Sequence, residues 1–361
     1  MTGDRPQDAV PPLRLPRRIR LLLGCAFLLL VAAVAADLVT GPGTTLSPVL
    51  AVAPILVGVT TRRPRVPMIT GAIAIAAVAL LELSNNGLPD SVHLTALITV
   101  LAATLASAAN VGLVAARERE LSQVRTVAEA AQRALLRPPP ERIGPLRIAV
   151  RYAAAAAEAR IGGDLYEVAD TPYGIRILLG DVQGHGLPAV ETAADVLGVF
   201  REAARTEPDL ARLAERLDAA LAGRPANERF VTALFLEVPP GGAAGFVNCG
   251  HPHPLLRRDG LVVELEPPLH APPLGLLGLV GGQYQAGRFE PRTDDLLLLH
   301  TDGVSEARNA AGRFYPLAQR WAELHPGSPE DLLDALLGDV GAWVGAGGLD
   351  DDAAMLAVRW E

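Results

Sequence analysis

The pattern of apolar residues changes once along the chain, near residue 116, and divides the chain into two parts. The first part contains four long apolar runs, at residues 19–36, 46–60, 67–83 and 93–116. Each run approaches the roughly 20 residues that a helix needs to cross a bilayer. A cleaved signal peptide is the alternative explanation of the first run, but its removal would leave an odd number of spans. The pattern therefore predicts four transmembrane helices within residues 19–116.

Charged residues between the runs predict how these helices are oriented. Basic residues precede the first run and separate the second run from the third: Arg14, Arg17, Arg18, Arg20, Arg62, Arg63 and Arg65. The other two connections contain Asp37 and Asp90 and neither Lys nor Arg. Because basic loops stay in the cytoplasm, we expect a cytoplasmic tail at residues 1–18 and both termini on the cytoplasmic side of a multi-pass cell-membrane protein. The runs contain no obvious substrate path, which favours an anchor or sensor over a transporter.

A helical linker is expected at residues 117–140, because no glycine or proline interrupts the chain until the three prolines at 138–140. Apolar residues recur there at alternating steps of three and four, at Leu121, Val124, Ala128, Ala131 and Leu135. This short heptad pattern has two interpretations. The helix rests on its own domain, or it forms a coiled coil that joins two chains in a homodimer and carries motion from the membrane.

The second part, residues 141–361, reads as a globular domain rich in strands. We expect strands at residues 146–152, 174–179, 230–238, 245–249, 255–257, 261–265, 283–289, 295–300 and 354–360. We expect helices at residues 189–206, 208–222, 316–324 and 329–344. Strands outnumber helices and several are joined by hairpin-length turns. This predicts an α+β domain with layered antiparallel sheets and helices outside them.

Composition narrows the function only a little. The net charge of −8 is modest and gives no reason to expect nucleic acid as a partner. The two cysteines, Cys25 and Cys249, do not suggest a disulfide framework, so a reducing compartment is expected for the globular part.

Acidic residues recur at the ends of expected strands, next to glycine or to another acid. The segments are "ARIGGDLYE" with Asp164, "ILLGD" with Asp181, "LLLLHTDG" with Asp302, and "GLDDDAAMLAV" with Asp350, Asp351 and Asp352. One acid at a strand end is explained by a turn or a helix cap. Four such ends in distant parts of the chain suggest a common site.

If these acids converge, their charges repel strongly and need a cation. The nearest cationic side chains in the sequence are Arg160 and Arg308, which is little positive charge for so many acids. Carboxylates without cysteine favour hard ions such as Mg²⁺ or Mn²⁺, and the glycines let the backbone approach the ions. Two such ions can generate a hydroxide and brace a phosphoryl group for in-line displacement.

Five segments, in this order, resemble the motifs of the metal-dependent protein phosphatases of the protein phosphatase 2C family, in the bacterial branch typified by stage II sporulation protein E. They are "IGGDLYE", "GDVQGHG", "NCGHPHPLL", "LLLLHTDGVSEARN" and "DDDAAMLAV". The resemblance extends from about residue 121 to the C-terminus. It implies an αββα sandwich, in which two antiparallel sheets pack together with helices on both outer faces.

The resemblance also implies roles for individual residues. Asp181 would bridge two Mn²⁺ or Mg²⁺ ions, and the carbonyl of Val182 would add a ligand. Asp302 and one terminal acid would complete one ion's shell, with Asp351 favoured and Asp352 next. Asp164 would hold a ligand position or metal-bound waters. The nucleophile would be a bridging water, without a phosphoenzyme.

Some positions depart from the family pattern. Glu167 stands where the first motif usually has Asp, so a surface role is the alternative to a metal role there. His185 lies four residues after Asp181 rather than two, and is a candidate general acid for the leaving group or, alternatively, a residue that holds the loop. No position matches the family's active-site arginine securely. His251 and His253 form only a weak zinc signal, and a structural role in their turn is favoured.

The resulting expectation is a membrane-anchored phosphatase that acts in the cytoplasm on phosphoserine or phosphothreonine. In the resembling branch the usual substrate is a phosphorylated anti-anti-sigma factor, which implies a sigma-factor partner-switching pathway. Two alternatives remain open: a catalytically silent membrane-tethered binding module, and a phosphoesterase that acts on small molecules. Neither requires nucleic acid.

Overall fold

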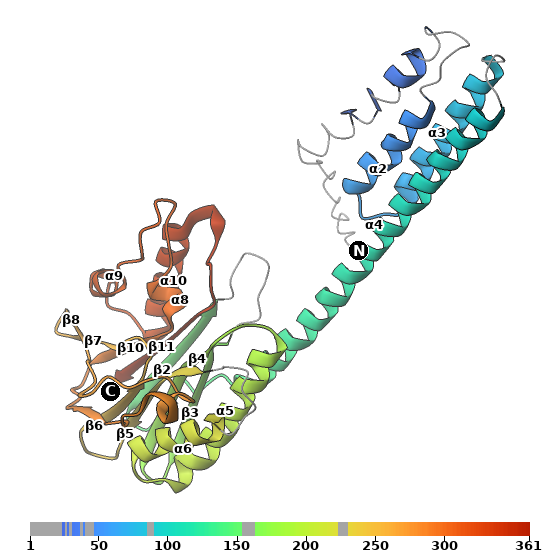
Figure 1. The fold of residues 1–361 in the computed structure, drawn as a ribbon. Helices are drawn as coiled ribbons and strands as arrows, with labels where there is room; N and C mark the ends of the chain where they lie inside the picture. The colour runs from blue at the N-terminus through green and yellow to red at the C-terminus, as the bar shows by residue number, and fades with distance from the viewer. Residues whose placement is uncertain are drawn as a thin grey trace, which may run out of the picture. The chain divides into compact units, whose positions relative to one another are not determined.

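The computed structural model describes residues 47–84, 90–153, 163–222 and 230–361, together with short stretches between residues 24 and 39. The chain forms two compact units, Met1–Ser122 and Gln123–Glu361 (Figure 1). Helix α4 (Asp90–Leu135) begins in the first unit and ends in the second. It includes both the fourth apolar run and most of the expected linker, so the two segments form one continuous helix.

The first unit is built from η1 (Ser47–Ala51), α2 (Val52–Val59), α3 (Arg65–Ser84) and the first part of α4. Small residues let these helices approach closely. A Cβ atom on Gly58 would lie 2.2 Å from Oγ of Ser107, and one on Gly71 would lie 2.1 Å from Oγ1 of Thr104. The Ser107 hydroxyl also donates a hydrogen bond of 2.8 Å to the carbonyl of Pro54. Contacts between small residues and hydroxyl bonds to a neighbouring helix are typical of helix packing in membranes.

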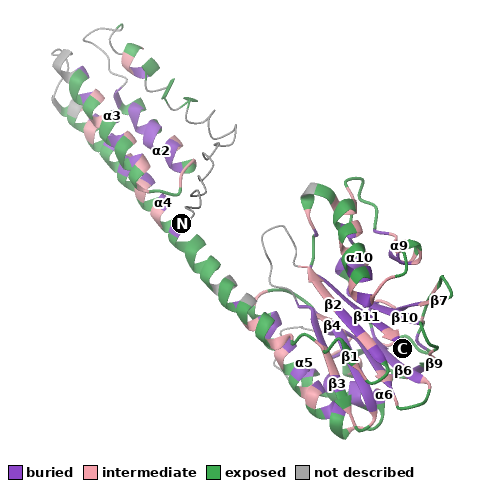
Figure 2. Cartoon of the chain, turned by 180° about the vertical axis from the view of Figure 1, so that it is seen from behind, coloured by how far each residue is buried: buried purple, intermediate pink, exposed green. Residues whose placement is uncertain are grey.

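Among the described residues, one helix is long and apolar enough to cross a membrane, the helix that includes Leu94–Leu135. The segments Ser47–Val59 and Arg65–Leu81 are apolar but shorter. Large apolar side chains on α3 and α4 are exposed (Figure 2), among them Met68, Ile69, Ile73, Leu80, Leu94, Ile98, Leu101, Leu105 and Leu113. The predicted run at residues 19–36 is described only in part. Four membrane spans therefore remain a prediction.

The second unit contains two antiparallel sheets. One sheet has the strand order β1 (Arg142–Ile143), β2 (Leu146–Ala153), β11 (Ala353–Trp360), β10 (Leu296–His300), β7 (Leu255–Arg258) and β8 (Leu261–Glu264). The other has the order β3 (Leu165–Thr171), β4 (Gly174–Val182), β5 (Val231–Val238), β6 (Ala244–Cys249) and β9 (Gly287–Phe289). All adjacent strands are antiparallel.

Side chains between the sheets form one apolar layer, which includes Ile177, Leu234 and Leu299. Helices α5 (Leu187–Thr206) and α6 (Leu210–Ala222) cover the outer face of the second sheet. Helices α9 (Leu317–Glu323) and α10 (Pro329–Val344) cover the outer face of the first (Figure 1). Strands β4 and β11 are buried along nearly their whole length, as their purple colour shows (Figure 2). The predicted α+β sandwich, two antiparallel sheets flanked by helices, is confirmed.

Strand β4 is buried along nearly its whole length and includes an arginine, Arg176, with no exposed surface. Its guanidinium pairs with Glu237 on β5 and donates to the carbonyls of Ala204, Glu207 and Pro208 at the end of α5. Carbonyls at a helix C-terminus lack partners within the helix. Arg176 therefore satisfies them and joins the helical layer to the sheet.

Most predicted elements agree with the structure within a few residues, including α5, α6, α9 and α10. The prediction missed β3, because its exposed and buried positions do not alternate and because it follows the glycine–glycine–aspartate segment. It also missed the short helices α7 (Leu277–Val280) and α8 (Asp302–Ser305).

The heptad positions at the end of α4 pack within the second unit. Ala128 is fully buried against Val190 of α5, and Ala131 and Leu135 are partly buried in the same cluster. This arrangement agrees with the interpretation in which the linker helix rests on its own domain. Leu121, one of the first positions of the pattern, is exposed.

Candidate metal and active site

The acids at strand ends come from both sheets. Asp164 precedes β3 and Asp181 lies near the end of β4, and the β3–β4 register pairs Leu165 with Gly180. Asp164 therefore lies beside Asp181, at the C-terminal end of β4. The backbone N–H of Val182 donates to the carbonyl of Gly163 at 3.1 Å, which extends the pairing by one step.

The other sheet contributes Asp302, at the start of α8, and the acids before β11. Thr301 connects these segments. Its N–H donates to the carbonyl of Ala354 at 3.0 Å, and its hydroxyl accepts from the N–H of Ala354 at 2.9 Å. The same hydroxyl donates to Oδ2 of Asp164 at 3.1 Å. One buried threonine thus links the acid-bearing edges of the two sheets.

Two glycines allow these segments to meet. A Cβ atom on Gly163 would lie 2.2 Å from the carbonyl oxygen of Val182 and 2.8 Å from Oδ1 of Asp181. A Cβ atom on Gly303 would lie 1.8 Å from the carbonyl oxygen of Asp352. Neither position has room for a side chain. This explains why glycine accompanies the acids in "GGD" and "TDG".

Burial and the charges of neighbouring acids raise the pKa values of three acids at this site. Burial raises the pKa of Asp164 well above its usual value, and the charges of Asp181 and Asp352 raise it further. Burial, followed by the charges of Asp302, Asp351 and Asp352, raises the pKa of Asp181 to about 7. Partial burial and the charge of Asp351 raise the pKa of Asp302. Each shift reflects an unfavourable charge that the other acids intensify.

Among the described residues, the charged groups that shift the pKa values of Asp164, Asp181 and Asp302 are other acids. The groups that shift the pKa values of Asp164, Asp181 and Asp302 include no Lys, Arg or His side chain of the described chain. Arg160 lies outside the described residues, and the guanidinium of Arg308 stacks over the ring of Phe314 at 4.7 Å. Within the described residues, the charges that act on these three acids are therefore negative.

A pair of hard divalent cations would fit this donor set, because carboxylate and carbonyl oxygens are their preferred ligands. The close approach at Gly163 agrees with that fit, because it brings the carbonyl oxygen of Val182 and the carboxylate of Asp181 to the same point of the backbone. Within the described part of the chain, no three His, Cys, Asp or Glu side chains are arranged so that together they could hold one metal ion.

A hydrogen-bond network continues from the acids to helix α4. The hydroxyl of Tyr152, at the end of β2, donates to Oδ2 of Asp352 at 2.7 Å and accepts from Nε2 of Gln132 at 3.1 Å. Asp352 is buried, whereas Asp351 is exposed and accepts a hydrogen bond from the N–H of Asp352. Sequence reasoning missed Tyr152, because only the β2–β11 register, which pairs Tyr152 with Ala354, brings it to this site.

A sequence model of stage II sporulation protein E (SpoIIE) matches residues 171–361, just over half of the chain. The chain belongs to the SpoIIE family. The match begins at Thr171, the last residue of β3, and covers the segments with Asp181, Asp302 and Asp351.

Solved structures share the fold. The PP2C domain of SiaA from Pseudomonas aeruginosa superposes with a TM-score of 0.59 at 19% identity, over 68% of this chain and all of that one. The phosphatase domain with a regulatory fragment of SpoIIE from Bacillus subtilis gives 0.50 at 17% identity, over 59% of this chain and 63% of that one. The RsbU and RsbW domains of a Mycobacterium tuberculosis protein give 0.50 at 23% identity, over 60% of each chain. The chain thus spans less than two thirds of the last two.

The remaining predicted positions of this SpoIIE-family domain have different surroundings. His185 is exposed in the turn between β4 and α5. Glu167 lies on β3 and accepts a hydrogen bond of 2.6 Å from Arg201 of α5, which also donates to the carbonyl of Leu135. Glu167 therefore takes part in a largely buried ion pair with α5 and is not the free surface acid that the alternative expected.

The two histidines of "NCGHPHPLL" do not share an environment. His251 is buried and its Nδ1 lies 3.0 Å from the hydroxyl of Thr232, while burial lowers its pKa to about 3. Asn248 holds the turn through hydrogen bonds to the N–H and the carbonyl of His251. His253 instead faces Glu264. These contacts agree with a structural role rather than a zinc pair.

Proposed function

We propose that this protein is a metal-dependent phosphatase that hydrolyses phosphoserine or phosphothreonine in a protein substrate. One observation carries the proposal: acids from both sheets gather at one edge, where burial and the charges of neighbouring acids raise the pKa values of Asp164, Asp181 and Asp302. Such an arrangement is costly for folding and is explained by a site that binds cations and an anionic substrate. Membership of the SpoIIE family supports the same class of reaction.

In this proposal two Mn²⁺ or Mg²⁺ ions are held by the acids of both sheets. Asp181, Asp302 and Asp351 would hold the ions, the carbonyl of Val182 would supply a further oxygen ligand, and Asp164 would hold a ligand position or metal-bound waters. When bound, the ions neutralise the carboxylates, polarise the phosphoryl group and activate solvent for in-line attack.

The surroundings of the acids suggest a division of roles. Asp352 already accepts a hydrogen bond from Tyr152, whereas Asp351 is exposed, which favours Asp351 as the ligand and Asp352 as its support. Thr301 orients Asp164 in the same way. His185, four residues beyond Asp181, is the candidate proton donor to the leaving alkoxide, and holding the turn is its alternative role.

We further propose that the first unit anchors the protein in the cell membrane through four spans, with the catalytic domain in the cytoplasm. The exposed apolar side chains of α3 and α4 and the contacts between small residues support this proposal. For the substrate we propose a phosphorylated anti-anti-sigma factor in a partner-switching pathway. Similarity to RsbU and RsbW domains supports a protein substrate of this kind.

The deciding experiment measures phosphate release from a phosphoserine peptide by the full-length chain with and without Mn²⁺. Asp181→Asn and Asp302→Asn should each lower turnover by about two orders of magnitude or more, because bound metal contributes several kcal/mol to such reactions. Circular dichroism should show that both variants are folded. Normal turnover in either variant would refute the metal assignment.

The same assay separates the two alternatives. A silent binding module would release no phosphate from any substrate. A small-molecule phosphoesterase would hydrolyse an aryl phosphate but not the phosphopeptide.

A further inference from the structure

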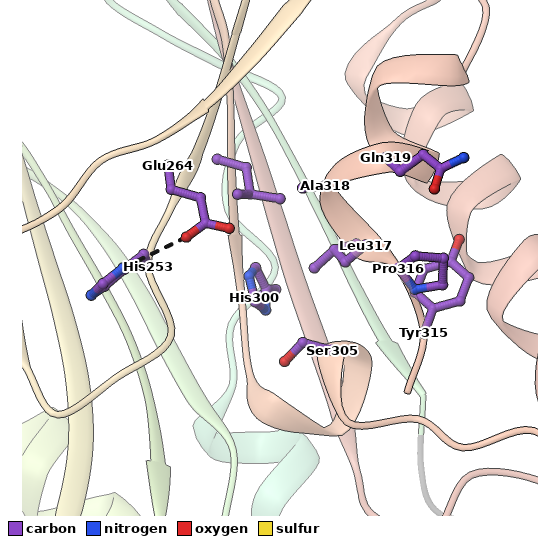
Figure 3. Close-up of a pocket in the computed structure, with 10 residues that line it drawn as sticks. His253, Glu264, His300, Ser305, Tyr315, Pro316, Leu317, Ala318 and Gln319 are labelled. Carbon is purple, nitrogen blue, oxygen red and sulfur yellow. Dashed lines mark ion pairs between the residues drawn. The ribbon is translucent and has the colours of Figure 1, made fainter. Parts of the chain in front are cut away.

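A pocket of about 440 Å³ lies beside helix α8 in the second unit (Figure 3). Its wall is formed by chain segments that are distant in sequence: the start of β7, the end of β8, the end of β10, α8, and the first turn of α9. The volume is within the range of sites that bind small ligands or large side chains. Neither the metal proposal nor the family motifs assign it a role.

The pocket and the acid cluster share one stretch of chain. His300 and Ser305 line the pocket, and Asp302 lies between them in sequence, at the start of α8. Ser305 is three residues after Asp302, so the two are separated by about one helical turn, roughly 5 Å along the axis. An extended peptide advances about 3.3 Å per residue. When a phosphorylated residue is held at the acids, the side chain of a substrate residue one to three positions from it can therefore reach this pocket.

The charge of the lining favours a cationic guest. Glu264 is the one carboxylate among the lining residues, and neither Lys nor Arg lines the pocket. Figure 3 shows the carboxylate of this exposed residue directed toward His253. Within the described residues its ion pair is with Nδ1 of His253, at 3.9 Å, which is too long for a hydrogen bond. The oxygens of Glu264 can therefore accept hydrogen bonds from a guest.

The rest of the lining suits an aliphatic stem. Leu255 and Leu317 contribute apolar surface. Tyr315 presents its ring, because its hydroxyl already donates to Asp339 of α10 at 2.5 Å. Lysine and arginine combine a chain of methylene groups with a charged head, so their stems pack on apolar walls while their heads reach a polar partner.

We propose that this pocket is a substrate subsite that receives a lysine or arginine side chain located within three residues of the phosphorylated serine or threonine. Glu264 accepts hydrogen bonds from the cationic head, and Leu255, Leu317 and the ring of Tyr315 pack against the stem. This proposal rests on the proposed phosphatase function and narrows its substrates to phosphoproteins with a basic residue beside the phosphosite. An aryl phosphate bound at the acids would leave the subsite empty.

The test uses the full-length chain with Mn²⁺ and a set of phosphoserine peptides that carry one lysine at each position from three residues before to three residues after the phosphoserine. Each peptide is compared with its alanine counterpart. At one or two positions the lysine peptide should have a kcat/KM about five-fold higher, the gain expected for a partly exposed ion pair of about 1 kcal/mol. In Glu264→Gln this ratio should fall to about one.

Two further variants make the result specific. Glu266 is also exposed, lies two residues beyond Glu264 and does not line the pocket, so Glu266→Gln should keep the lysine preference. Glu264→Lys should reverse the preference in favour of glutamate at the same position. Equal lysine-to-alanine ratios in the wild type and Glu264→Gln would overturn the subsite. If the wild type hydrolysed none of the peptides, the phosphatase proposal itself would fail, and the subsite with it.

Discussion

The hydroxyl of Tyr152 lies 2.7 Å from Oδ2 of Asp352 and accepts a hydrogen bond of 3.1 Å from Gln132, so it connects this acid to helix α4. Asp352 is buried at the edge where the acids of both sheets meet. A neutral hydroxyl that donates to a buried carboxylate fixes its rotamer and lowers the cost of its charge. Tyr152 is therefore a positioning residue for the proposed metal site.

Replacing Tyr152 by phenylalanine should weaken metal-dependent activity without unfolding the domain. Removal of a hydrogen bond that supports a ligand shell typically costs about tenfold or more in metal affinity or activity. We expect the Mn²⁺ concentration at half-maximal activity to rise by about tenfold. Tyr173→Phe is the matched control, because the Tyr173 hydroxyl makes a long, exposed contact of 3.4 Å with the carbonyl of Thr206. An unchanged Mn²⁺ dependence in Tyr152→Phe would remove the positioning role.

The stability of the metal-free protein should fall as the pH rises. The pKa of Asp181 is about 7 in the folded protein, above the unfolded value near 3.8, so the folded state holds the proton more tightly. This contribution is fully present below pH 4 and is lost as the pH rises through 7. With a chelator present, the melting temperature should therefore decrease between pH 5 and pH 8 by several degrees, and Mn²⁺ should restore it.

Asp181→Asn should flatten this pH profile, because the amide does not ionise. Asp170→Asn is the control, since Asp170 is an exposed acid at the far end of β3 and should leave the slope unchanged. The same slope in Asp181→Asn as in the wild type would mean that the raised pKa of this acid does not govern the stability.

Gly163→Ala should destabilise the domain by about 1–3 kcal/mol, as overpacking of a tight contact does. Its Cβ atom would meet backbone at 2.2 Å, which cannot move without separating β3 from β4. Gly338→Ala in α10 provides the contrast, because a Cβ atom there has no neighbour within 4 Å and alanine favours a helix by about 0.5–1 kcal/mol. Denaturant unfolding of both variants measures the difference, and equal midpoints would contradict the close approach at Gly163.

Truncation tests the two interpretations of the linker helix. Because Ala128 is buried and Gln132 bonds Tyr152, a fragment that begins at Gly144 should unfold at a lower denaturant concentration than one that begins at Leu121. The structure leads us to expect that both fragments are monomers. A longer fragment that sediments as a dimer, beside a monomeric shorter one, would instead support the coiled coil.

The sequence was sufficient to predict the layered sandwich, because alternating apolar strands and amphipathic helices leave few other ways to bury both faces of two sheets. It was also sufficient to select Asp164, Asp181 and Asp302 as candidate site residues, since an acid beside glycine at a strand end is a local feature. It was not sufficient for Tyr152 or Thr301. Their roles depend on strand register and on the contact between two sheets, which are long-range properties.

Side-chain burial and ion pairing explain the other differences between the sequence predictions and the structure. Glu167 looked like part of an acid motif, but only the fold brings Arg201 of α5 next to it. The repeat from Leu121 to Leu135 was compatible with a second chain or with the domain itself, because a heptad pattern reports an apolar stripe and not its partner. The contact between Ala128 and Val190 shows that the last turns of helix α4 pack against the domain itself.

The position of Thr301 has a consequence for how this protein loses activity. Its hydroxyl joins Asp164 of one sheet to Ala354 of the other, so the two halves of the site are separated as soon as the sandwich opens. Partial unfolding that parts the layers would abolish turnover before much secondary structure is lost. Enzymatic inactivation during gradual heating would then report the cooperative opening of the sandwich itself.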